Sequence, residues 1–163
     1  MSKPKVYIIL VNYNGWQDTF LAILSLVAQT YKNYEIIIVD NKSTDKSIQR
    51  IIDCFSDPNY CIPKEIPHKI QDIILNGAKN LKKINIRLFT ENQIQEISDN
   101  NDYSNDHINV DIIAASRNKG FAAGNNIGIK YAQKYDDFKY LWLFNNDAVA
   151  DKNALNELVN KME

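Results

Sequence analysis

The chain has 163 residues, of which 45% are apolar, 24% charged and 10% aromatic, which suffices for one domain with a hydrophobic core. Its 19 basic and 20 acidic residues leave a formal net charge of −1, which argues against a nucleic-acid-binding surface or an acidic tail. The cysteines Cys54 and Cys61 match no metal-ligand spacing, so we expect reduced structural thiols in a cytosolic protein. The first apolar run, residues 6–11, is too short for a signal peptide or a membrane span.

Two apolar, β-branched runs in the first forty residues predict strands that are buried on both faces, at residues 6–11 and 35–39. Between them, apolar residues at helical spacing predict a helix from Trp16 to Thr30 that packs on the first strand. A second helix is expected to start at Ser43 or Thr44 as N-cap. Its expected apolar face consists of Ile48, Ile51, Ile52 and Phe55. This βαβα order predicts an α/β fold with a mostly parallel sheet flanked by helices.

Residues 56–110 have a different composition, rich in Asn, Asp, Lys and Ile and interrupted by three prolines. We interpret them as an insertion into a single domain of residues 1–163, with 98–106 as a mobile loop. Within the insertion, 70–75 is expected to be helical and 84–89 to form a strand.

The strand-and-helix order resumes after this segment. Residues 111–116 and 140–144 are predicted to be buried strands, and a helix beginning near Ala122 separates them. Asp151 is expected to cap a last helix. The apolar stripe of that helix would consist of Leu155, Leu158, Val159 and Met162.

Polar clusters stand where three of the predicted strands end, at residues 40–45, 117–121 and 145–147. In an open parallel sheet, the ligand crevice lies outside the carboxyl ends of the strands. The clusters are therefore expected to meet around one ligand, although they are far apart in sequence.

The first cluster opens with Asp40. Its carboxylate could accept hydrogen bonds from a nucleotide base or ribose. The alternative, which we weigh as equal, is an Asp that starts a turn at a strand end. For Asp45 we favour a simple preference for a helix N-terminus.

The second cluster, Arg117-Asn118-Lys119-Gly120, leads into a helix that carries Gly124 and Gly128. A free helix N-terminus flanked by Arg117 and Lys119 suits a phosphate or an array of sugar hydroxyls. Each glycine inside a helix costs about 1 kcal/mol relative to Ala, so the two need a reason. Tight packing of the helix on the sheet is the alternative reason. The spacing does not match a dinucleotide-binding motif.

The third cluster is Asn145-Asn146-Asp147. A divalent cation on a diphosphate needs only one or two protein oxygens, and Asp147 could supply one while Asn145 contributes an amide oxygen or contacts ribose. Such an ion would neutralise a departing diphosphate. The alternative is an ordinary turn after a strand, which we favour for Asn146.

Taken together, five segments resemble the nucleotide-binding half of family-2 glycosyltransferases of the GT-A fold, particularly rhamnosyltransferase-like members. The segments are residues 11–16, 28–31, 38–45, 118–128 and 143–147. The resemblance implies that Asp40, together with Asn41, belongs to the part of the site that holds the nucleotide base. It further places Asn12 and Asn14 in the nucleotide-proximal loop.

The resemblance also assigns the later segments. The stretch that starts at Arg117 and contains Asn118, Gly120, Gly124 and Asn125 would approach the donor sugar and diphosphate. Residues 145–147 occupy the place of the Asp-x-Asp motif, so Asn145 would contact the donor and Asp147 would bind Mg²⁺ or Mn²⁺.

These assignments imply an inverting, metal-dependent transfer of a sugar from a nucleotide-diphosphate donor to a glycan or lipid-linked acceptor. Rhamnose is suggested as the sugar by resemblance alone. A cytoplasmic location follows, and the resemblance is compatible with the inner face of the membrane, with peripheral membrane association and with pairing to a second chain.

Two departures qualify this expectation. The 56–110 segment has no recognised counterpart, and the chain stops one helix after Asp147, before the half that carries the base in family members. The fold is thus expected to be incomplete at its C-terminus, and no catalytic residue is assigned. The alternative function is a non-catalytic nucleotide-binding module or one chain of a split enzyme. A nucleotidyltransferase is disfavoured because 12–15 lacks the Gly-rich, Arg-containing loop.

Overall fold

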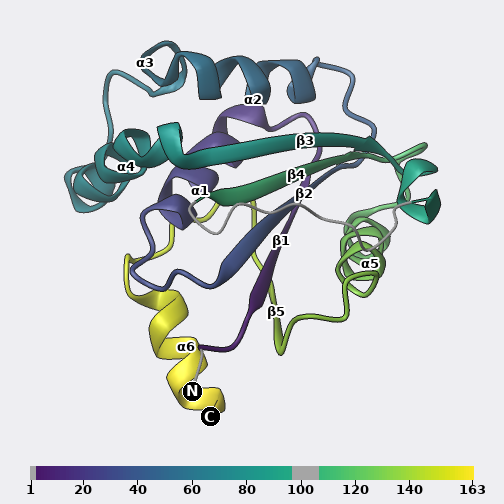
Figure 1. Ribbon diagram of the computed structural model, residues 1–163. Helices are drawn as coiled ribbons and strands as arrows, with labels where there is room; N and C mark the ends of the chain where they lie inside the picture. The colour runs from purple at the N-terminus through teal and green to yellow at the C-terminus, as the bar shows by residue number, and fades with distance from the viewer. Residues whose placement is uncertain (1–2, 97–106) are drawn as a thin grey trace.

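The computed structural model describes residues 3–96 and 107–163. Its centre is a five-stranded sheet in the order β3-β4-β2-β1-β5, in which all neighbouring strands are parallel (Figure 1). In chain order the strands are β1 (Val6–Asn12), β2 (Tyr34–Asp40), β3 (Ile84–Thr90), β4 (Ile108–Ala114) and β5 (Tyr140–Leu143). Every residue of β1 and β2 is buried, as expected for apolar strands covered on both faces. The predicted parallel α/β sheet is confirmed.

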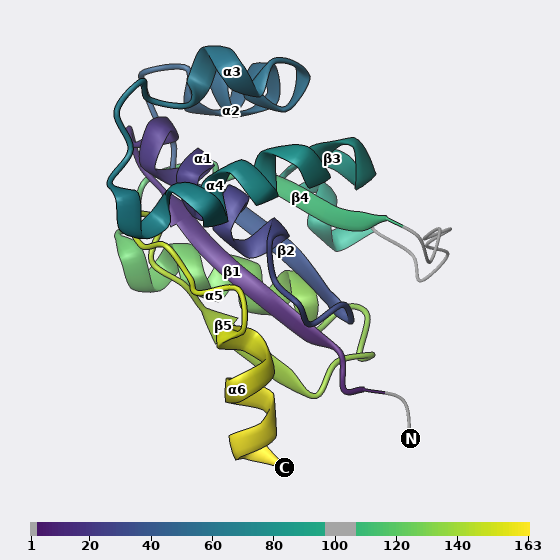
Figure 2. The same ribbon diagram turned by 90° about the vertical axis from the view of Figure 1, so that its left-hand side faces the viewer.

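Helices cover both faces of this sheet. They are α1 (Trp16–Val27), α2 (Ser47–Ser56), α3 (Pro58–Cys61), α4 (His68–Asn80), α5 (Phe121–Ala132) and α6 (Ala154–Met162), with the short 3-10 helices η1 (Leu81–Lys83) and η2 (Gln93–Glu96). Figures 1 and 2 show α5 on one face and α1 with α6 on the other, and Ile94 of η2 packs in the same cluster as α5. The side chains of β1 alternate accordingly, because Ile8 packs in the cluster of α1 and α6 while Ile9 packs in the cluster of α5.

Three glycines let helices approach their neighbours closely. A Cβ on Gly124 would lie 2.7 Å from Val11 Cγ1, and one on Gly128 would lie 2.6 Å from Ile9 Cγ2. The two glycines of α5 therefore serve tight packing on β1, which was the alternative reason given for them. Gly77 of α4 is more constrained still, since its Cβ would lie 2.0 Å from the backbone oxygen of Leu24 in α1.

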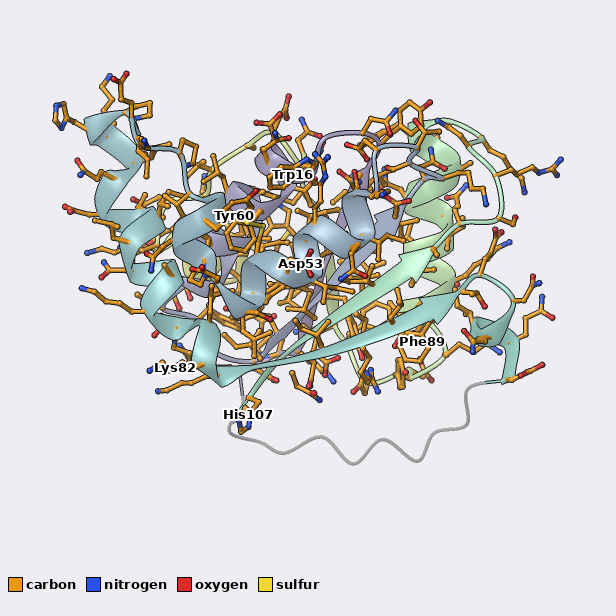
Figure 3. The ribbon with its side chains drawn as sticks, turned by 90° about the horizontal axis from the view of Figure 1, so that it is seen from above. Trp16, Asp53, Tyr60, Lys82, Phe89 and His107 are labelled. Carbon is orange, nitrogen blue, oxygen red and sulfur yellow. A yellow bond between two sulfur atoms is a disulfide. The ribbon has the colours of Figure 1, made fainter. Side chains whose placement is uncertain are left out.

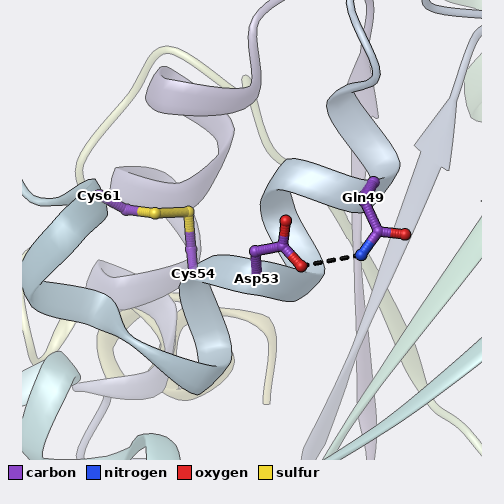
Figure 4. The surroundings of a disulfide bond; sticks show 4 residues. All are labelled: Gln49, Asp53, Cys54 and Cys61. Carbon is purple, nitrogen blue, oxygen red and sulfur yellow. Dashed lines mark hydrogen bonds between the residues drawn. A yellow bond between two sulfur atoms is a disulfide. The ribbon is translucent and has the colours of Figure 1, made fainter.

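The expectation of reduced thiols is wrong, because Cys54 and Cys61 form a disulfide (Figure 4). Pro58 begins the short helix α3 directly after α2. This turn brings the two Cα atoms to 5.5 Å, although seven positions separate the residues. Both cysteines are buried with Phe20 and Leu24 of α1, so the bond ties α2 and α3 together over α1.

Two predicted helix caps are also wrong. Helix α2 begins at Ser47, and Asp45 rather than Ser43 or Thr44 accepts the hydrogen bond from the Ser47 backbone N–H at 2.9 Å. Asp151 accepts from the backbone N–H of Asn153 at 2.9 Å. It therefore shapes the turn before α6 instead of capping the helix itself.

The last predicted strand and helix are less buried than expected. The β5 strand lies at the edge of the sheet, and its Leu143 is 50% exposed. In α6, Leu155 and Val159 are buried, whereas Leu158 and Met162 are exposed. The apolar stripe of α6 thus continues past the surface that β1 and β5 cover.

The segment at 56–110 adds to the same sheet and helical layer. It contains α4 and β3, as the apolar runs at 70–75 and 84–89 predicted, and β3 pairs in parallel with β4. The predicted loop at 98–106 lies outside the described residues. The interpretation of this segment as an insertion into a single domain stays a prediction.

Candidate functional site

The polar clusters that follow β1, β2, β4 and β5 lie along the carboxyl edge of the sheet. The strand register aligns Asn12 with Asp40, Asp40 with Ala114, and Ile9 with Leu143. The carboxyl ends of β1, β2 and β4 are therefore level with one another. The loop after β5 starts beside them. The register confirms that the predicted clusters lie at one edge of the sheet. That they surround one ligand stays a prediction.

The buried pair of Asn12 and Asp40 forms the centre of this edge. Asn12 donates from Nδ2 to Asp40 Oδ2 at 2.7 Å, and the backbone N–H of Ser43 donates to Asp40 Oδ1 at 2.9 Å. Each carboxylate oxygen thus already has one protein donor, and Asp40 is only 3% exposed. The turn-forming interpretation of Asp40 is therefore correct, and its remaining lone pairs are what a ligand could use.

A relay of hydrogen bonds connects this pair to the loop after β5. The Thr19 hydroxyl donates to Asn12 Oδ1 at 2.8 Å, and Asn146 Nδ2 donates to Thr19 Oγ1 at 3.0 Å. Asn146 is therefore a positioning residue, whereas the sequence favoured only an ordinary turn for it. Asn145 and Asp147 on either side of it are exposed. Sequence reasoning missed Thr19. Its one signal was a polar residue next to the apolar positions of α1.

The loops after β1 and β2 are tied to each other. Asn14 accepts from the Thr44 backbone N–H at 2.8 Å through Oδ1, and its own backbone N–H donates to Ser43 Oγ at 2.9 Å. Asn14, Lys42 and Lys46 all have positive φ, at 51°, 66° and 63°. Such backbone conformations are costly for residues other than glycine and often occur at functional sites.

The glycine-containing junction before α5 is held against the end of β2. Asn41 Nδ2 donates to Asn118 Oδ1 at 2.9 Å and to the Gly120 carbonyl at 3.1 Å. Gly120 has φ 86° and ψ 174°, a conformation that is almost restricted to glycine. The junction therefore presents the N-terminus of α5 to the same edge, with Arg117 and Lys119 exposed beside it.

A carboxylate that the sequence did not single out supports this junction. Glu91, which follows β3, accepts from the hydroxyl of Ser116 at 2.6 Å and from its backbone N–H at 2.8 Å. These two hydrogen bonds, with weaker attraction from Lys119 and Arg117, lower the pKa of the Glu91 carboxyl. Glu91 thereby fixes the residue that precedes Arg117.

The described residues contain no cluster of three or more His, Cys, Asp or Glu side chains that could hold a metal ion alone. The edge instead offers one exposed carboxylate, Asp147, next to the exposed amide of Asn145. This donor set fits a cation that takes its other ligands from a bound diphosphate and water. It does not fit a permanently bound metal.

Hollows also occur elsewhere on the described surface, among them one next to the starts of α1 and α2 and one at β5. One is lined by residues of α1, α2 and α3, namely Trp16, Lys46, Gln49, Arg50, Asp53, Tyr60 and Cys61; Figure 3 shows Trp16, Asp53 and Tyr60 on that side of the molecule. The other is an apolar groove between β5 and α6 that includes Leu141, Trp142, Leu158 and Met162. None of the described helices combines the length and the hydropathy required to cross a bilayer.

The family is identified by comparison with known proteins. The model of Glycosyl transferase family 2 matches residues 7–81 and 89–163, so the chain belongs to this family. An uncharacterized glycosyltransferase of Haemophilus influenzae is 43% identical over 51 residues, which are 31% of this chain and 20% of that protein. The match extends over much of the 56–110 segment.

Solved structures agree on the fold. The crystal structure of S. aureus TarS 1–349 in complex with UDP has a TM-score of 0.55 at 16% identity, covering 96% of this chain and 31% of that one. A second TarS crystal structure has a TM-score of 0.52, and the match covers 19% of that TarS chain. These likenesses show the GT-A-like Rossmann fold. The chain spans about a fifth of the curated relative and under a third of the TarS chains.

Proposed function

We propose that this chain binds the nucleotide-diphosphate sugar of an inverting, metal-dependent glycosyltransferase. The observation that carries the proposal is the network that locks the loops after β1, β2 and β5 together. It runs from Asp40 through Asn12 and Thr19 to Asn146. Such preorganisation reduces the entropy lost when a ligand is held. The UDP in the TarS complex is consistent with a nucleotide at this edge.

Different residues of the chain are proposed to contact different parts of the donor. Asp40 and Asn41, with Asn12 and Asn14, surround the place proposed for the nucleoside. Free backbone N–H groups at the start of α5 and the guanidinium of Arg117 suit the diphosphate. When bound between Asp147 and the diphosphate, Mg²⁺ or Mn²⁺ would offset the charge of the leaving group.

The base that takes the proton from the attacking hydroxyl is not among the residues assigned here. Transfer to a glycan or lipid-linked acceptor, with rhamnose as one donor sugar, is therefore proposed from the family alone. So are a cytoplasmic location and peripheral contact with a membrane.

A thermal-shift screen tests donor binding. UDP, GDP and dTDP at millimolar concentration, each with and without Mg²⁺ or Mn²⁺, should include one pair that raises the melting temperature, because a ligand that binds only the folded state stabilises it. Failure of every nucleotide to shift the intact protein would refute the proposal.

The metal assignment needs its own variant. Asp147→Ala should lose the metal-dependent part of the shift, whereas Asp72→Ala, which removes an exposed carboxylate of α4, should keep it. If Asp147→Ala responds to metal and nucleotide as the parent does, Asp147 is not the ligand.

A second candidate is a nucleotide-binding polypeptide that lacks turnover and acts with another chain. The apolar groove between β5 and α6 favours it, because Leu158 and Met162 are exposed there beside β5, the last strand of the described sheet. Both candidates predict nucleotide binding. A donor-hydrolysis assay separates them, since only the complete enzyme should release free sugar.

A further inference from the structure

The hollow that lies between α1, α2 and the short helix α3 contains none of the residues proposed to contact the donor. Its volume is about 380 Å³, which is within the range of small-molecule pockets. Its lining runs from Lys46, at the start of α2, to Asp53 and on to Tyr60 of α3 (Figure 3). Because Lys46 and Asp53 are seven positions apart, the hollow extends about 10 Å along α2.

An exposed aromatic ring stands at the α3 end of this hollow. Tyr60 has 84% of its surface accessible, and it belongs to a helix of only four residues. A helix this short is unstable by itself. The disulfide from the adjacent Cys61 to Cys54 of α2 holds it in place. The ring is therefore both accessible and preorganised, so a ligand that stacks on it loses little entropy in ordering it.

Positive charge predominates at the other end of the hollow. Among the described residues, no carboxylate forms an ion pair with Lys46 or Arg50. The carboxylate of Asp53 accepts from Gln49 Nε2 at 2.8 Å (Figure 4). The Arg50 guanidinium lies over the ring of Trp16, 5.3 Å from its centroid, and this contact orients it. Two cations without an acidic partner suit an anionic group of a ligand.

The lining selects the class of ligand. One carboxylate beside two cations does not suit a divalent metal, and inorganic phosphate would leave the ring of Tyr60 without a contact. A saccharide that carries an acidic group uses both ends of the hollow. Its weakly positive ring C–H bonds pack on the negative face of an aromatic ring, and its carboxylate or phosphate reaches Lys46 and Arg50.

We propose that this hollow binds an anionic saccharide unit, held by the ring of Tyr60 and by the cations of Lys46 and Arg50. In a transferase that unit belongs to the acceptor glycan, and this part of the assignment rests on the proposed function. Trp16 and Lys46 directly follow the loops after β1 and β2. The hollow therefore opens beside the edge proposed for the donor, and an acceptor bound there would carry negative charge.

A protein-observed NMR titration tests the proposal, because it locates binding without requiring activity. The probes are methyl β-glucuronide and glucose 6-phosphate, with methyl β-glucoside, inorganic phosphate and UMP for comparison, all at millimolar concentration. The indole N–H of Trp16 reports on the hollow, and that of Trp142 in β5 serves as the internal reference. The variants are Tyr60→Ala and Arg50→Gln. The control is Asn59→Ala, which changes the exposed neighbour of Tyr60 in α3.

At least one acidic saccharide should shift the Trp16 signal and leave the Trp142 signal in place. It should bind about fivefold more tightly than the neutral glucoside and than phosphate, because the ring and the charge each contribute. Tyr60→Ala and Arg50→Gln should each weaken that binding by about fivefold. Asn59→Ala should bind as the parent does.

Three results would overturn the inference. The first is the absence of any shift at Trp16 with both acidic saccharides. The second is equal binding of phosphate and the acidic saccharides with no loss in Tyr60→Ala, which indicates a site for simple anions only. The third is UMP binding that Tyr60→Ala weakens as much as saccharide binding, which would assign the hollow to the nucleotide.

The proposed donor function stands or falls separately. A positive nucleotide screen with a negative saccharide titration overturns the inference alone. Saccharide binding with a negative nucleotide screen supports the hollow as a saccharide site and overturns its assignment to an acceptor.

Discussion

The two edges of the sheet are built from different chemistry. At the amino edge, charges pair with each other: Lys5 contacts Glu35 at 2.7 Å and also Asp137, while Lys139 contacts Glu163 at 2.6 Å. At the carboxyl edge, neutral amides predominate and two of their buried oxygens stay unpaired. Of the non-glycine residues with positive φ in the described part of the chain, Asn14, Lys42 and Lys46 lie there and Asp136 does not.

We infer from this difference that the amino edge contributes to stability, whereas the carboxyl edge contributes to nucleotide binding. At the amino edge the charged groups are engaged in ion pairs with each other, and one oxygen of Glu35 lacks a donor among the described residues. The carboxyl edge uses its amides to fix the loops and leaves a helix N-terminus and the carboxylate of Asp147 exposed. We therefore expect changes at the amino edge to alter stability alone, and changes at the carboxyl edge to alter nucleotide binding as well.

The largest effect is expected for Asp40→Ala. Asn12 Nδ2 and the Ser43 N–H would lose their buried acceptor, so the free energy of unfolding should fall by about 2–4 kcal/mol and nucleotide binding should be lost. Urea unfolding and calorimetry measure the two quantities. Unchanged binding in the folded variant would contradict the proposed role of this edge.

Lys5→Met should destabilise the protein without affecting nucleotide binding. Burial alone would lower the pKa of Lys5, but hydrogen bonds to Asp137 and Glu35 outweigh it and the pKa is raised. The ion-pair contribution is thus fully present at neutral pH and is lost only as the pH rises through that raised value. We expect a loss of about 2 kcal/mol, because the largely buried Glu35 would lose its partner.

The exposed Lys3→Met, at the same edge, serves as the control for this measurement. Weaker nucleotide binding in Lys5→Met would break the proposed separation between the two edges.

Gly120→Ala should cost about 1–2 kcal/mol in the free energy of unfolding. No atom lies within 4 Å of the position that a Cβ would take, so the cost arises from the backbone conformation at φ 86° alone. Because relief of this strain would move the start of α5, we expect a larger loss of nucleotide affinity than of stability. Equal binding by variant and parent would show that the junction tolerates displacement.

The smallest effect is expected for Glu91→Gln, below about 0.5 kcal/mol because the residue is partly exposed to solvent, which screens the charge. Hydrogen bonds from Ser116 lower the Glu91 pKa below its ordinary 4.5, so its contribution is present above that value and is lost as the pH falls through the lowered one. Melting temperatures of parent and variant should converge as the pH falls from 7 to 3. Parallel curves would argue against this carboxylate as a support of the junction.

Much of the scaffold was predictable because it depends on local patterns. Apolar runs identified all five strands, and helical spacing identified α1, α2, α4, α5 and α6. The clusters at strand ends were predicted to meet because parallel strands place their carboxyl ends at one edge. The disulfide was missed because a spacing of seven residues has no fixed geometry until Pro58 starts a helical turn.

The residues that support the site could not be predicted from local sequence patterns. Thr19 and Glu91 are single polar residues in otherwise ordinary segments, and their partners are distant in sequence: Asn146 is 127 residues from Thr19. The cap of α2 was misplaced for a related reason. The Ser43 hydroxyl accepts from the Asn14 backbone N–H of another loop, and α2 begins only at Ser47.

The sequence by itself determined the parallel α/β class, the order of its elements and the three polar clusters, because these follow from hydrophobic periodicity and local turn chemistry. Tertiary structure alone decided which polar atoms are used up within the protein and which remain free. Hydrogen bonding between distant loops is a property of their relative positions. For that reason Asn146 became a support, while the buried oxygens of Asn41 and Asn125 were left without donors.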